Sequence, residues 1–537
     1  MLRTLLVGLD GATFSILGPL MEEGVMPFLH NFVGRSVKAE LLSTPNYQTA
    51  QAWPSMTTGR SPGNTGMFDF VRFEARPYGP YLTVTNSRDL RCETIWSIVS
   101  RNNRTVTSLN FYGMHPPRPI NGYSVSGFIP FRHIKGAVYP PSLYDRMKSL
   151  PRFSAKELAM DLDLEKKCII GLPQEEYEDW ILLHVRREQQ WFELLSHLMI
   201  NDPTDLTGIV FDGVDKLQHL CWRFLDRRLF PKSPSNWEKH IRNLCLNYFK
   251  QIDAILAEII YLSGSKSQTF IVSDHGFGDS TEVFYVNVWL HENGYLHWTD
   301  EESFDVSESL TANRLKDHIS LVDWQRTSAY AITPSSNGIF IRQASDGRKF
   351  GVPASEYEAF RQRLIDGLLG FKDLVTGESV VKRVRTREEA YPGPFAALAP
   401  DLLLTLRDGG FVSILNCDTP LKPRAAPVGT HRPEGIFIAA GAGLRSGVTT
   451  APLSILDIAP TVLFGLDVAI PEDFEGRVPT QIFEPSFLAT HPMLSDHPGS
   501  QLVPISSDAP VDDDEKAAEA AIIEQLTLLN YLEKPSG

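Results

Sequence analysis

Cysteine is scarce in this chain, and the few cysteines are widely spaced. The 537 residues include only five, Cys92, Cys168, Cys221, Cys245 and Cys417, and no C-x-x-C pair is present. An odd number of scattered cysteines argues against a disulfide framework and against a zinc site built on thiolates. We therefore expect a protein whose cysteines stay reduced.

Long apolar segments and dense runs of basic residues are also missing. No apolar run reaches the roughly 18 residues that a membrane helix needs, and the chain enters a strand at residues 5–9 without the pattern of a signal peptide. The net charge of −14 argues against a nucleic-acid binder. We therefore expect a cytoplasmic protein with no transmembrane segment and no nucleic-acid-binding patch.

What the chain does contain is an alternation of short apolar strands and amphipathic helical stretches. This alternation predicts an α/β fold with a mostly parallel central sheet and helices on both faces. The predicted strands are residues 5–9, 38–43, 105–110, 206–211, 269–272 and 436–440, and the predicted helices are 14–28, 50–58, 93–101, 173–200, 237–262 and 453–466.

Two insertions interrupt the alternation, at about 111–200 and 280–428. The first begins with a stretch rich in Pro, Gly and aromatic residues, 111–139, which we interpret as an ordered irregular excursion. The second contains short strands and loops, and we interpret it as a lid or small subdomain. Its predicted elements are strands 338–341 and 402–406 and a helix near 356–369.

The C-terminal part of the chain differs in composition from the rest. Residues 1–490 are expected to form one catalytic domain with the two insertions inside it. Residues 491–514 are rich in Pro, Ser and Asp and are predicted to be a linker. Residues 515–537 are predicted to form a C-terminal helix whose apolar stripe docks back or meets a partner.

Acidic and imidazole side chains stand where predicted strands end. Asp10 and Asp274 directly follow strands, and the carboxyl ends of strands in an open α/β sheet are the usual place for a ligand site. Asp215 and His219 are four residues apart, which puts them on one face of a helix. His275 and His431 lie in glycine-flanked loops. Taken alone, the Asp-His-Gly triplet is equally consistent with a turn that ends a strand.

Three aspartates and three histidines form the mixed oxygen and nitrogen ligand set of a zinc or manganese site. Six groups are enough for two ions, and a pair of ions stabilises both the attacking and the leaving oxygen in phosphoryl displacement. We therefore expect two divalent metal ions, with zinc as the first choice and manganese as the second.

Thr49 stands directly ahead of the predicted short helix 50–58. A hydroxyl at this place points toward an anion that the helix N-terminus already favours, and beside a metal ion it can act as a nucleophile. Threonine is also a common N-cap residue, so the sequence leaves both roles open.

Five segments of the chain occur in an order that resembles the alkaline phosphatase superfamily. They are most similar to its type I phosphodiesterase/nucleotide pyrophosphatase branch, and especially to a bacterial group of predicted phosphohydrolases and phosphomutases. The resemblance covers about residues 1–485 and implies an alkaline phosphatase-like fold. The segments are Gly8-Leu9-Asp10-Gly11-Ala12, Thr49 through Thr58-Gly59, Asp215-x-x-x-His219, Asp274-His275-Gly276 and Gly429-Thr430-His431-Arg432-Pro433.

The resemblance implies a division of the ligands between two ions. Asp215, His219 and His431 would hold one ion, and Thr49 would be the nucleophile. The second ion would be held by Asp10, Thr49, Asp274 and His275.

The expected function is metal-dependent hydrolysis of a phosphoric ester or diester through a phosphothreonine on Thr49. The alternatives are a phosphomutase or phosphotransferase of the same superfamily, and a non-catalytic binding protein on this fold. The expected substrate is a small-molecule, lipid-linked or glycan-linked phosphate ester, which the sequence does not identify further. Side chains left open as substrate contacts are Arg60, Asn64, His115, His133 and Lys216.

Overall fold

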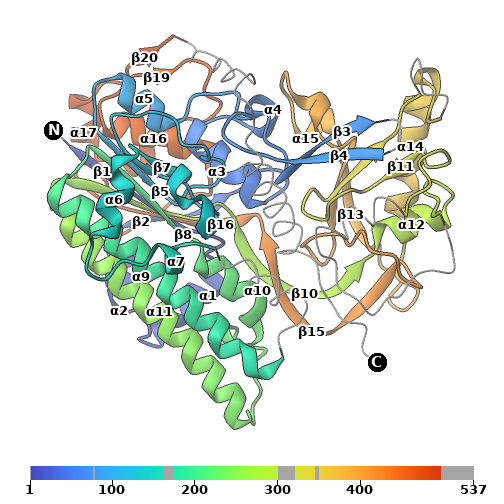
Figure 1. The fold of residues 1–537 in the computed structure, drawn as a ribbon, viewed down its shortest axis with the longest axis horizontal. Coiled ribbons are helices and arrows are strands. Elements are labelled where there is room, and N and C mark those ends of the chain that lie inside the picture. Colours follow the sequence, from blue (N-terminus) through green and yellow to red (C-terminus); the bar gives the residue numbers. More distant parts are fainter. Residues whose placement is uncertain (1, 77–78, 161–172, 300–320, 345–349, 498–537) are drawn as a thin grey trace.

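A large sheet forms the centre of the first of two lobes (Figure 1). The computed structural model describes residues 2–76, 79–160, 173–299, 321–344 and 350–497. β1 lies in the middle of this sheet, between β9 and β8, and is parallel to both. The order across the sheet is β17 (Val448–Thr449), β2 (Val37–Leu42), β16 (Glu434–Gly441), β9 (Ser267–Val272), β1 (Arg3–Leu9), β8 (Leu206–Phe211), β5 (Val106–Leu109), β6 (Gly122–Val125) and β7 (Val138–Tyr139).

One strand inside the sheet, β16, runs opposite to both of its neighbours, β9 and β2. The outer strand β7 is antiparallel to β6, and the other pairings are parallel, including that of β18 (Leu453–Ser454) with β2. Because β16 is reversed, the residues that precede it reach the same sheet edge as the residues that follow β1 and β9. That edge is where α/β sheets place their ligand sites.

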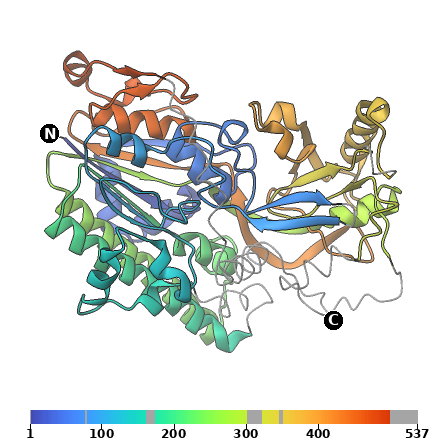
Figure 2. The same ribbon diagram turned by 45° about the horizontal axis from the view of Figure 1, so that its top comes forward.

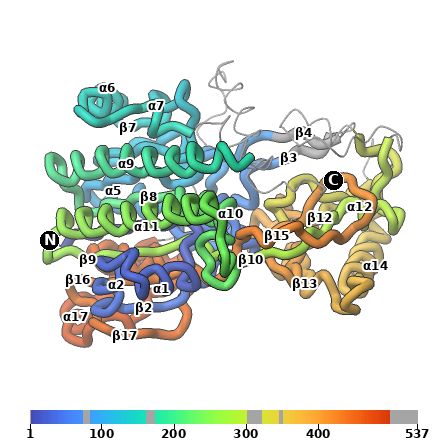
Figure 3. Tube along the Cα trace, turned by 90° about the horizontal axis from the view of Figure 1, so that it is seen from below, coloured from blue at the N-terminus to red at the C-terminus, as the bar shows by residue number. Residues whose placement is uncertain are grey.

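Helices cover both faces of the sheet, which confirms the predicted α/β fold. Figure 3 shows α9 and α11 side by side along one face. Within the described part of the chain, no helix combines the length and the apolar character needed to span a bilayer. One face carries α1 (Phe14–Glu22), α2 (Pro27–Gly34), α9 (Tyr177–Asn201), α10 (Gly213–Leu225) and α11 (Asn236–Ser263), and the other carries α3 (Thr49–Thr58), α5 (Ile95–Arg101) and α16 (Ile458–Gly465).

Two glycines in the sheet make room for tryptophans of the helices that cover it. A Cβ on Gly8 of β1 would lie 2.4 Å from the ring of Trp53 in α3, and one on Gly208 of β8 would lie 2.3 Å from Trp96 in α5. Both tryptophans are buried. Because the ring of Trp53 rests directly on β1, the position of α3 relative to the sheet is tightly defined, and α3 begins at Thr49.

The second lobe is inserted between β9 and β16 and joins the first lobe through a two-stranded ribbon (Figure 1). The strands predicted at 338–341 and 402–406 and the helix near 356–369 are confirmed there. The ribbon pairs β10 (Gly276–Phe284) with β15 (Leu421–Arg432), and the lobe contains β11 (Ala329–Tyr330), β12 (Gly338–Ile341), β14 (Leu402–Leu406), β13 (Val381–Thr386), α12 (Val286–Glu292), α14 (Tyr357–Gly370) and α15 (Arg387–Ala390).

A hairpin that the sequence reading missed links the two lobes. It consists of β3 (Val71–Arg76) and β4 (Gly79–Val84), and it leaves the first lobe to lie beside the second (Figure 2). The alternation of apolar Val71, Phe73 and Ala75 with charged residues is a strand pattern, so the signal was present in the sequence.

Three predictions of local structure were wrong in part. Residues 111–139 are not irregular throughout, because β6 and β7 extend the central sheet and Phe131–Ala137 forms a 3₁₀ helix. The helix predicted at 14–28 is two helices, separated at Gly24, whose φ of +72° ends a right-handed helix. The helix predicted at 453–466 is confined to α16, which follows β18 and a 3₁₀ turn.

The predicted linker begins at residue 491, and its first residues include β20 (Ser495–Asp496), which pairs with β19 (Ile470–Pro471). The rest of the linker and the predicted helix 515–537 lie outside the described residues. Other described helices are α4 (Pro62–Thr65), α6 (Ser142–Lys148), α7 (Ala155–Leu158) and α17 (Pro485–Thr490).

A buried carboxyl group on α9 fixes the start of α10, the helix that carries two of the predicted metal ligands. Glu188 Oε1 accepts hydrogen bonds from the backbone N–H of Gly213 (2.8 Å) and from the hydroxyl of Tyr248 on α11 (3.0 Å). Burial, together with the negative charge of Asp212, raises the pKa of Glu188 to about 8. The folded protein therefore keeps this carboxyl group protonated at pH values where the unfolded chain has released the proton.

Replacing Glu188 should change how stability depends on pH. Between the unfolded pKa of about 4.3 and the folded pKa of about 8, the folded state binds one more proton than the unfolded state. The free energy of unfolding therefore falls as pH rises, by up to about 1.4 kcal/mol per pH unit from this group. In Glu188→Gln this contribution is absent, so the variant should gain stability relative to the wild type as pH rises from about 5 to about 8.

Urea unfolding at several pH values measures this difference. Glu258→Gln, an exposed change on α11, is the control and should differ from the wild type by the same amount at every pH. A difference between Glu188→Gln and the wild type that stays constant with pH would show that Glu188 is ionised in the folded protein.

Candidate metal centre

The seven predicted site residues come together at one edge of the central sheet. They come from five local segments, which meet because the strands that precede or follow them are neighbours in the sheet. Asp10 follows β1, Asp274 and His275 follow β9, Asp215 and His219 lie on α10 after β8, Thr49 begins α3 after β2, and His431 lies near the end of β15, just ahead of β16.

One group of predicted ligands consists of Asp215, His219 and His431. The Nε2 atom of His431 lies 3.1 Å from Asp215 Oδ1, and the Nε2 atom of His219 lies 3.4 Å from the same oxygen. The two Nε2 atoms are 3.0 Å apart. One atom from each side chain therefore faces a common point, as three ligands of one ion do.

A second group surrounds Nε2 of His275. This nitrogen lies 3.5 Å from Asp10 Oδ1, 3.4 Å from Asp274 Oδ2 and 3.4 Å from the hydroxyl oxygen of Thr49. All four side chains are at least 95% buried, so the group is closed off from bulk water by the surrounding protein.

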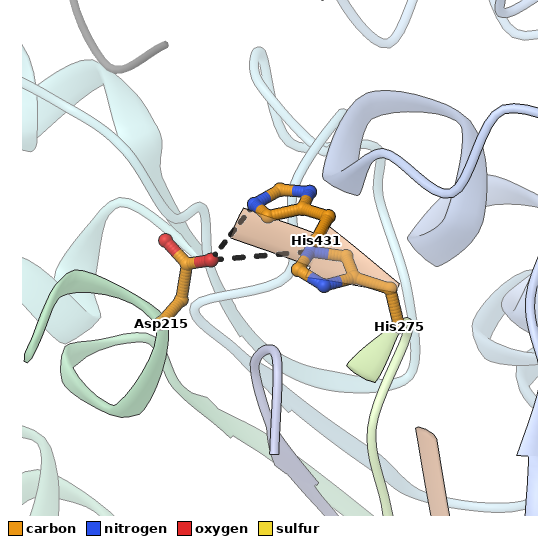
Figure 4. Close-up of side chains that lie close together, drawn as sticks. All are labelled: Asp215, His275 and His431. Carbon is orange, nitrogen blue, oxygen red and sulfur yellow. Dashed lines mark ion pairs between the residues drawn. The ribbon is translucent and has the colours of Figure 1, made fainter. Parts of the chain in front are cut away.

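The two groups are in contact with each other. The rings of His275 and His431 stack with their centres 3.7 Å apart, and Asp215 Oδ1 lies 4.0 Å from His275 Nε2 (Figure 4). Ligand atoms of Asp215, His275 and His431 also lie within 4.8 Å of one another, so His275 borders both groups. The arrangement suits two ions at neighbouring positions.

The two buried histidines are held with one ring nitrogen ready for a metal ion. The protonated Nδ1 of His275 donates to the carbonyl of Gly276, and that of His431 donates to the carbonyl of Tyr47, each over 3.1 Å. Burial lowers the pKa of His275 to about 4, and burial beside His275 lowers the pKa of His431 to about 3. Both rings are therefore neutral at pH 7, with the lone pair on Nε2.

Each carboxylate of the centre keeps one buried oxygen without a hydrogen-bond donor. The indole N–H of Trp53 donates to Asp10 Oδ2 (3.1 Å), and the backbone N–H of Gly11 donates to Asp274 Oδ1 (3.2 Å). Among the described residues, Asp10 Oδ1, Asp215 Oδ1 and Asp274 Oδ2 have no hydrogen-bond partner. These are the three oxygens that face the histidines, and unpartnered buried oxygens of this kind fit a cation.

The pKa values of the carboxyl groups reflect this crowding. Burial, reinforced by Asp274 and Asp215, raises the pKa of Asp10 well above its usual range. Burial and the charge of Asp215 raise the pKa of Asp274 to about 7, against the hydrogen bond from Gly11. For Asp215, burial is outweighed by His219 and His431, and its pKa lies well below the usual range. A divalent cation would relieve the repulsion among these carboxylates.

Thr49 is not the cap residue of α3. Gln48 occupies the N-cap position, and no side chain makes a capping hydrogen bond there. Thr49 is the first helical residue, and its hydroxyl oxygen faces His275 instead. The N–H groups of Gln51 and Ala52 already donate to the carbonyl of Gln48 (3.0 Å each). The N-terminal end of α3, with its positive dipole and its first N–H groups, still favours an anion beside the Thr49 hydroxyl.

The loop before Thr49 is bonded to the second lobe through a residue that the sequence reading missed. Asp69 accepts hydrogen bonds from the side-chain amide of Gln48 (2.9 Å) and from the hydroxyls of Ser335 (2.7 Å) and Thr333. The side-chain amide of Asn46 donates to the carbonyl of Ser335 (2.8 Å). No sequence motif marks Asp69, because its partners are brought to it only by the folding of the second lobe.

Of the residues left open as substrate contacts, Lys216 lies closest to the centre. Its ammonium group is buried, 3.7 Å from Asp215 Oδ2. Arg60 instead forms an ion pair with Asp473 (2.6 Å), and the side-chain amide of Asn64 donates to Glu475 (2.9 Å). These two residues hold the loop after α3 to the C-terminal part of the lobe.

His115 and His133 belong to neither ligand group. Both lie in the segment between β5 and the end of the 3₁₀ helix at Phe131–Ala137. Their role as substrate contacts stays a prediction.

A family model named type I phosphodiesterase / nucleotide pyrophosphatase matches residues 4–433. The chain belongs to this family. The match includes all seven residues of the centre, and the resemblance to the alkaline phosphatase superfamily is thereby confirmed. Members of the family are enzymes of the phosphoesterase type. A comparison with curated proteins found no match.

Solved structures with the same fold include two enzymes. An inactive variant of the murine ectonucleotide pyrophosphatase / phosphodiesterase 5 in complex with AMP has a TM-score of 0.50 and 12% identity, covering 87% of this chain and 96% of that one. The phosphonoacetate hydrolase of Sinorhizobium meliloti 1021 in complex with phosphonoformate has a TM-score of 0.50 and 15% identity, covering 87% and 95%. At this identity the likeness concerns the fold.

The ligand groups predict how the protein takes up metal. After treatment with a chelator and dialysis against zinc, the wild type should bind about two zinc ions per chain. His219→Ala and Asp274→Asn each remove a ligand from a different group, so each should lower the uptake by about one ion. Elemental analysis of the dialysed protein measures the uptake.

His240→Ala is the matched control, because His240 is an exposed histidine on α11 whose partner is Glu178. Its zinc content should equal that of the wild type. Wild-type uptake near zero, or full uptake in both ligand variants, would contradict the assignment of the two groups.

Proposed function

We propose that this chain hydrolyses a phosphoric ester or diester with Thr49 as the nucleophile, in a reaction that depends on divalent metal ions. The observation that carries the proposal is the place of Thr49. Its hydroxyl lies at the N-terminus of α3 and 3.4 Å from His275 Nε2, inside a buried cluster of acidic and imidazole side chains. Membership of a phosphodiesterase family supports the choice of substrate class.

The residues of the centre fit two divalent ions, with zinc as the first choice and manganese as the second. Asp215, His219 and His431 would hold one ion. When bound, such ions neutralise the charge of a phosphoryl group and favour the ionised form of a nearby hydroxyl. The other ion would be held by Asp10, Thr49, Asp274 and His275.

The chain's own groups then bind and cleave the ester. The N–H groups at the start of α3 and the positive end of its dipole hold the phosphoryl group beside Thr49. The hydroxyl oxygen of Thr49 attacks phosphorus and gives up its proton, the bond from phosphorus to the leaving oxygen breaks, and that oxygen departs with the electron pair and takes up a proton. Water attacks the phosphothreonine in the second half, which breaks the bond to Thr49 and returns its hydroxyl.

A phosphomutase or phosphotransferase would share the first half of this reaction and differ only in the acceptor. A purely binding role is disfavoured, because all seven side chains are retained and assembled. The substrate is proposed to be a small-molecule, lipid-linked or glycan-linked phosphate ester. A screen should include monoesters and diesters with zinc and with manganese, and glycerol as an alternative acceptor.

Substitution of Thr49 tests the nucleophile. Thr49→Ala should lose several orders of magnitude in rate, because no covalent path remains, whereas Thr49→Ser should keep measurable activity because its hydroxyl survives. Thr57→Ala is the matched control, since Thr57 is a buried threonine of the same helix whose hydroxyl donates to the carbonyl of Trp53. Its activity should stay close to that of the wild type.

Acid quenching during turnover tests the intermediate. Label from a phosphorus-labelled substrate should remain on the peptide that contains Thr49. Label on a histidine or an aspartate, or an active Thr49→Ala variant, would contradict the proposal.

A further inference from the structure

A cavity of about 640 Å³ lies between the two lobes, and none of the seven residues of the metal centre lines it. Its walls come from Gly66–Arg72 and Thr85–Arg91 of the first lobe, at the base of the β3–β4 hairpin, and from Tyr330–Gln343 and Arg387–Asp401 of the second lobe. At the cavity, the side chain of Arg72 is 51% exposed, and Leu398 is 59% exposed. A cavity of this volume is in the range of small-molecule sites.

The carboxylates that line the cavity are already engaged by the protein. Asp89 pairs with Arg72, and Asp401 pairs with Arg387 and also accepts from the backbone N–H of Ile341. Asp69 accepts the hydrogen bonds from both lobes described above. Negative charge in the walls is therefore satisfied within the fold.

Arg91 adds a positive charge to the cavity wall. Its guanidinium group is half-buried and lies 5.8 Å from the centre of the ring of Phe395. Among the described residues it has no carboxylate partner. A guanidinium group at a cavity wall without a counter-charge favours an anionic ligand, and it binds carboxylate, sulfonate or phosphate oxygens in a forked geometry.

Two aromatic rings from the second lobe supply an apolar surface. Tyr330 and Phe340 line the cavity with their rings stacked, 5.9 Å between centres and 23° between planes. Ile332 and Leu398 extend this apolar surface. The two residues are 6% and 8% exposed, so they offer the cavity a small, rigid apolar surface against which the apolar part of a ligand can pack.

We propose that this cavity binds a small organic anion with a planar apolar body, its anionic group on Arg91 and its body against Tyr330 and Phe340. The ligand touches both lobes, so it bridges the β3–β4 side of the first lobe and the second. The site is separate from the metal centre, and its test does not depend on the hydrolase activity.

Anilinonaphthalene sulfonate is a suitable probe, because it joins a sulfonate to a planar apolar body. Titration of the full chain, followed by probe fluorescence, should give saturable binding at about one site per chain. Arg91→Met removes the charge and keeps the length of the side chain, and it should raise the dissociation constant about tenfold or more. The uncharged analogue phenylnaphthylamine should bind the wild type and Arg91→Met with similar affinity.

Arg363→Met is the matched control. Arg363 is an exposed arginine of α14 that also contacts a ring, that of Phe360 at 5.6 Å, and it does not line the cavity. This variant should bind the probe as the wild type does.

A second variant keeps the test decisive if Arg91→Met fails to fold. Ala397 is an exposed residue of the cavity wall, and Ala397→Trp should fill the space and abolish saturable binding. No saturable binding by the wild type, or equal affinities in the wild type and a folded Arg91→Met or Ala397→Trp variant, would overturn the proposal.

Discussion

Three buried carboxylates, each with an oxygen that no donor of the described residues satisfies, are the constraint on which the rest of this structure depends. Asp10, Asp215 and Asp274 are brought together by the order of the strands, because β1 lies between β8 and β9. Leaving such oxygens unpartnered in a protein interior is costly unless a cation compensates for them. Trp53 connects this constraint to the proposed nucleophile: its ring packs on Gly8, its N–H donates to Asp10, and its helix begins at Thr49.

Much of the fold and of the candidate site could be predicted from local sequence. Strands ending in Asp10 or Asp274 are visible as short apolar runs followed by an acid, and the spacing of Asp215 and His219 follows from helix geometry. What local pattern does not contain is strand order and direction. The reversed β16, which brings His431 to the same edge, is a property of the whole sheet. Asp69 was missed for the same reason, since its partners Thr333 and Ser335 in the second lobe lie more than 260 residues away.

The second lobe also helps to position the residues before Thr49. Through Asn46, Gln48 and Asp69 it holds the loop that precedes Thr49. A shift of the lobe relative to the sheet would therefore displace the start of α3, and with it the proposed nucleophile. Asp69 also lines the cavity between the lobes, so that cavity and the loop before Thr49 share one wall. The insertion, in which the sequence shows no recognisable motif, thus helps to position the loop before Thr49 as well as lining the cavity.

The buried cluster is proposed to hold two metal ions, divided between the ligand groups of Asp215 and Asp274. Crystals of the zinc-loaded protein allow a direct test by anomalous diffraction at the zinc absorption edge. Two peaks are expected, one among Asp215, His219 and His431 and the other among Asp10, Thr49, Asp274 and His275. A single peak, or zinc bound elsewhere with the cluster empty, would contradict it.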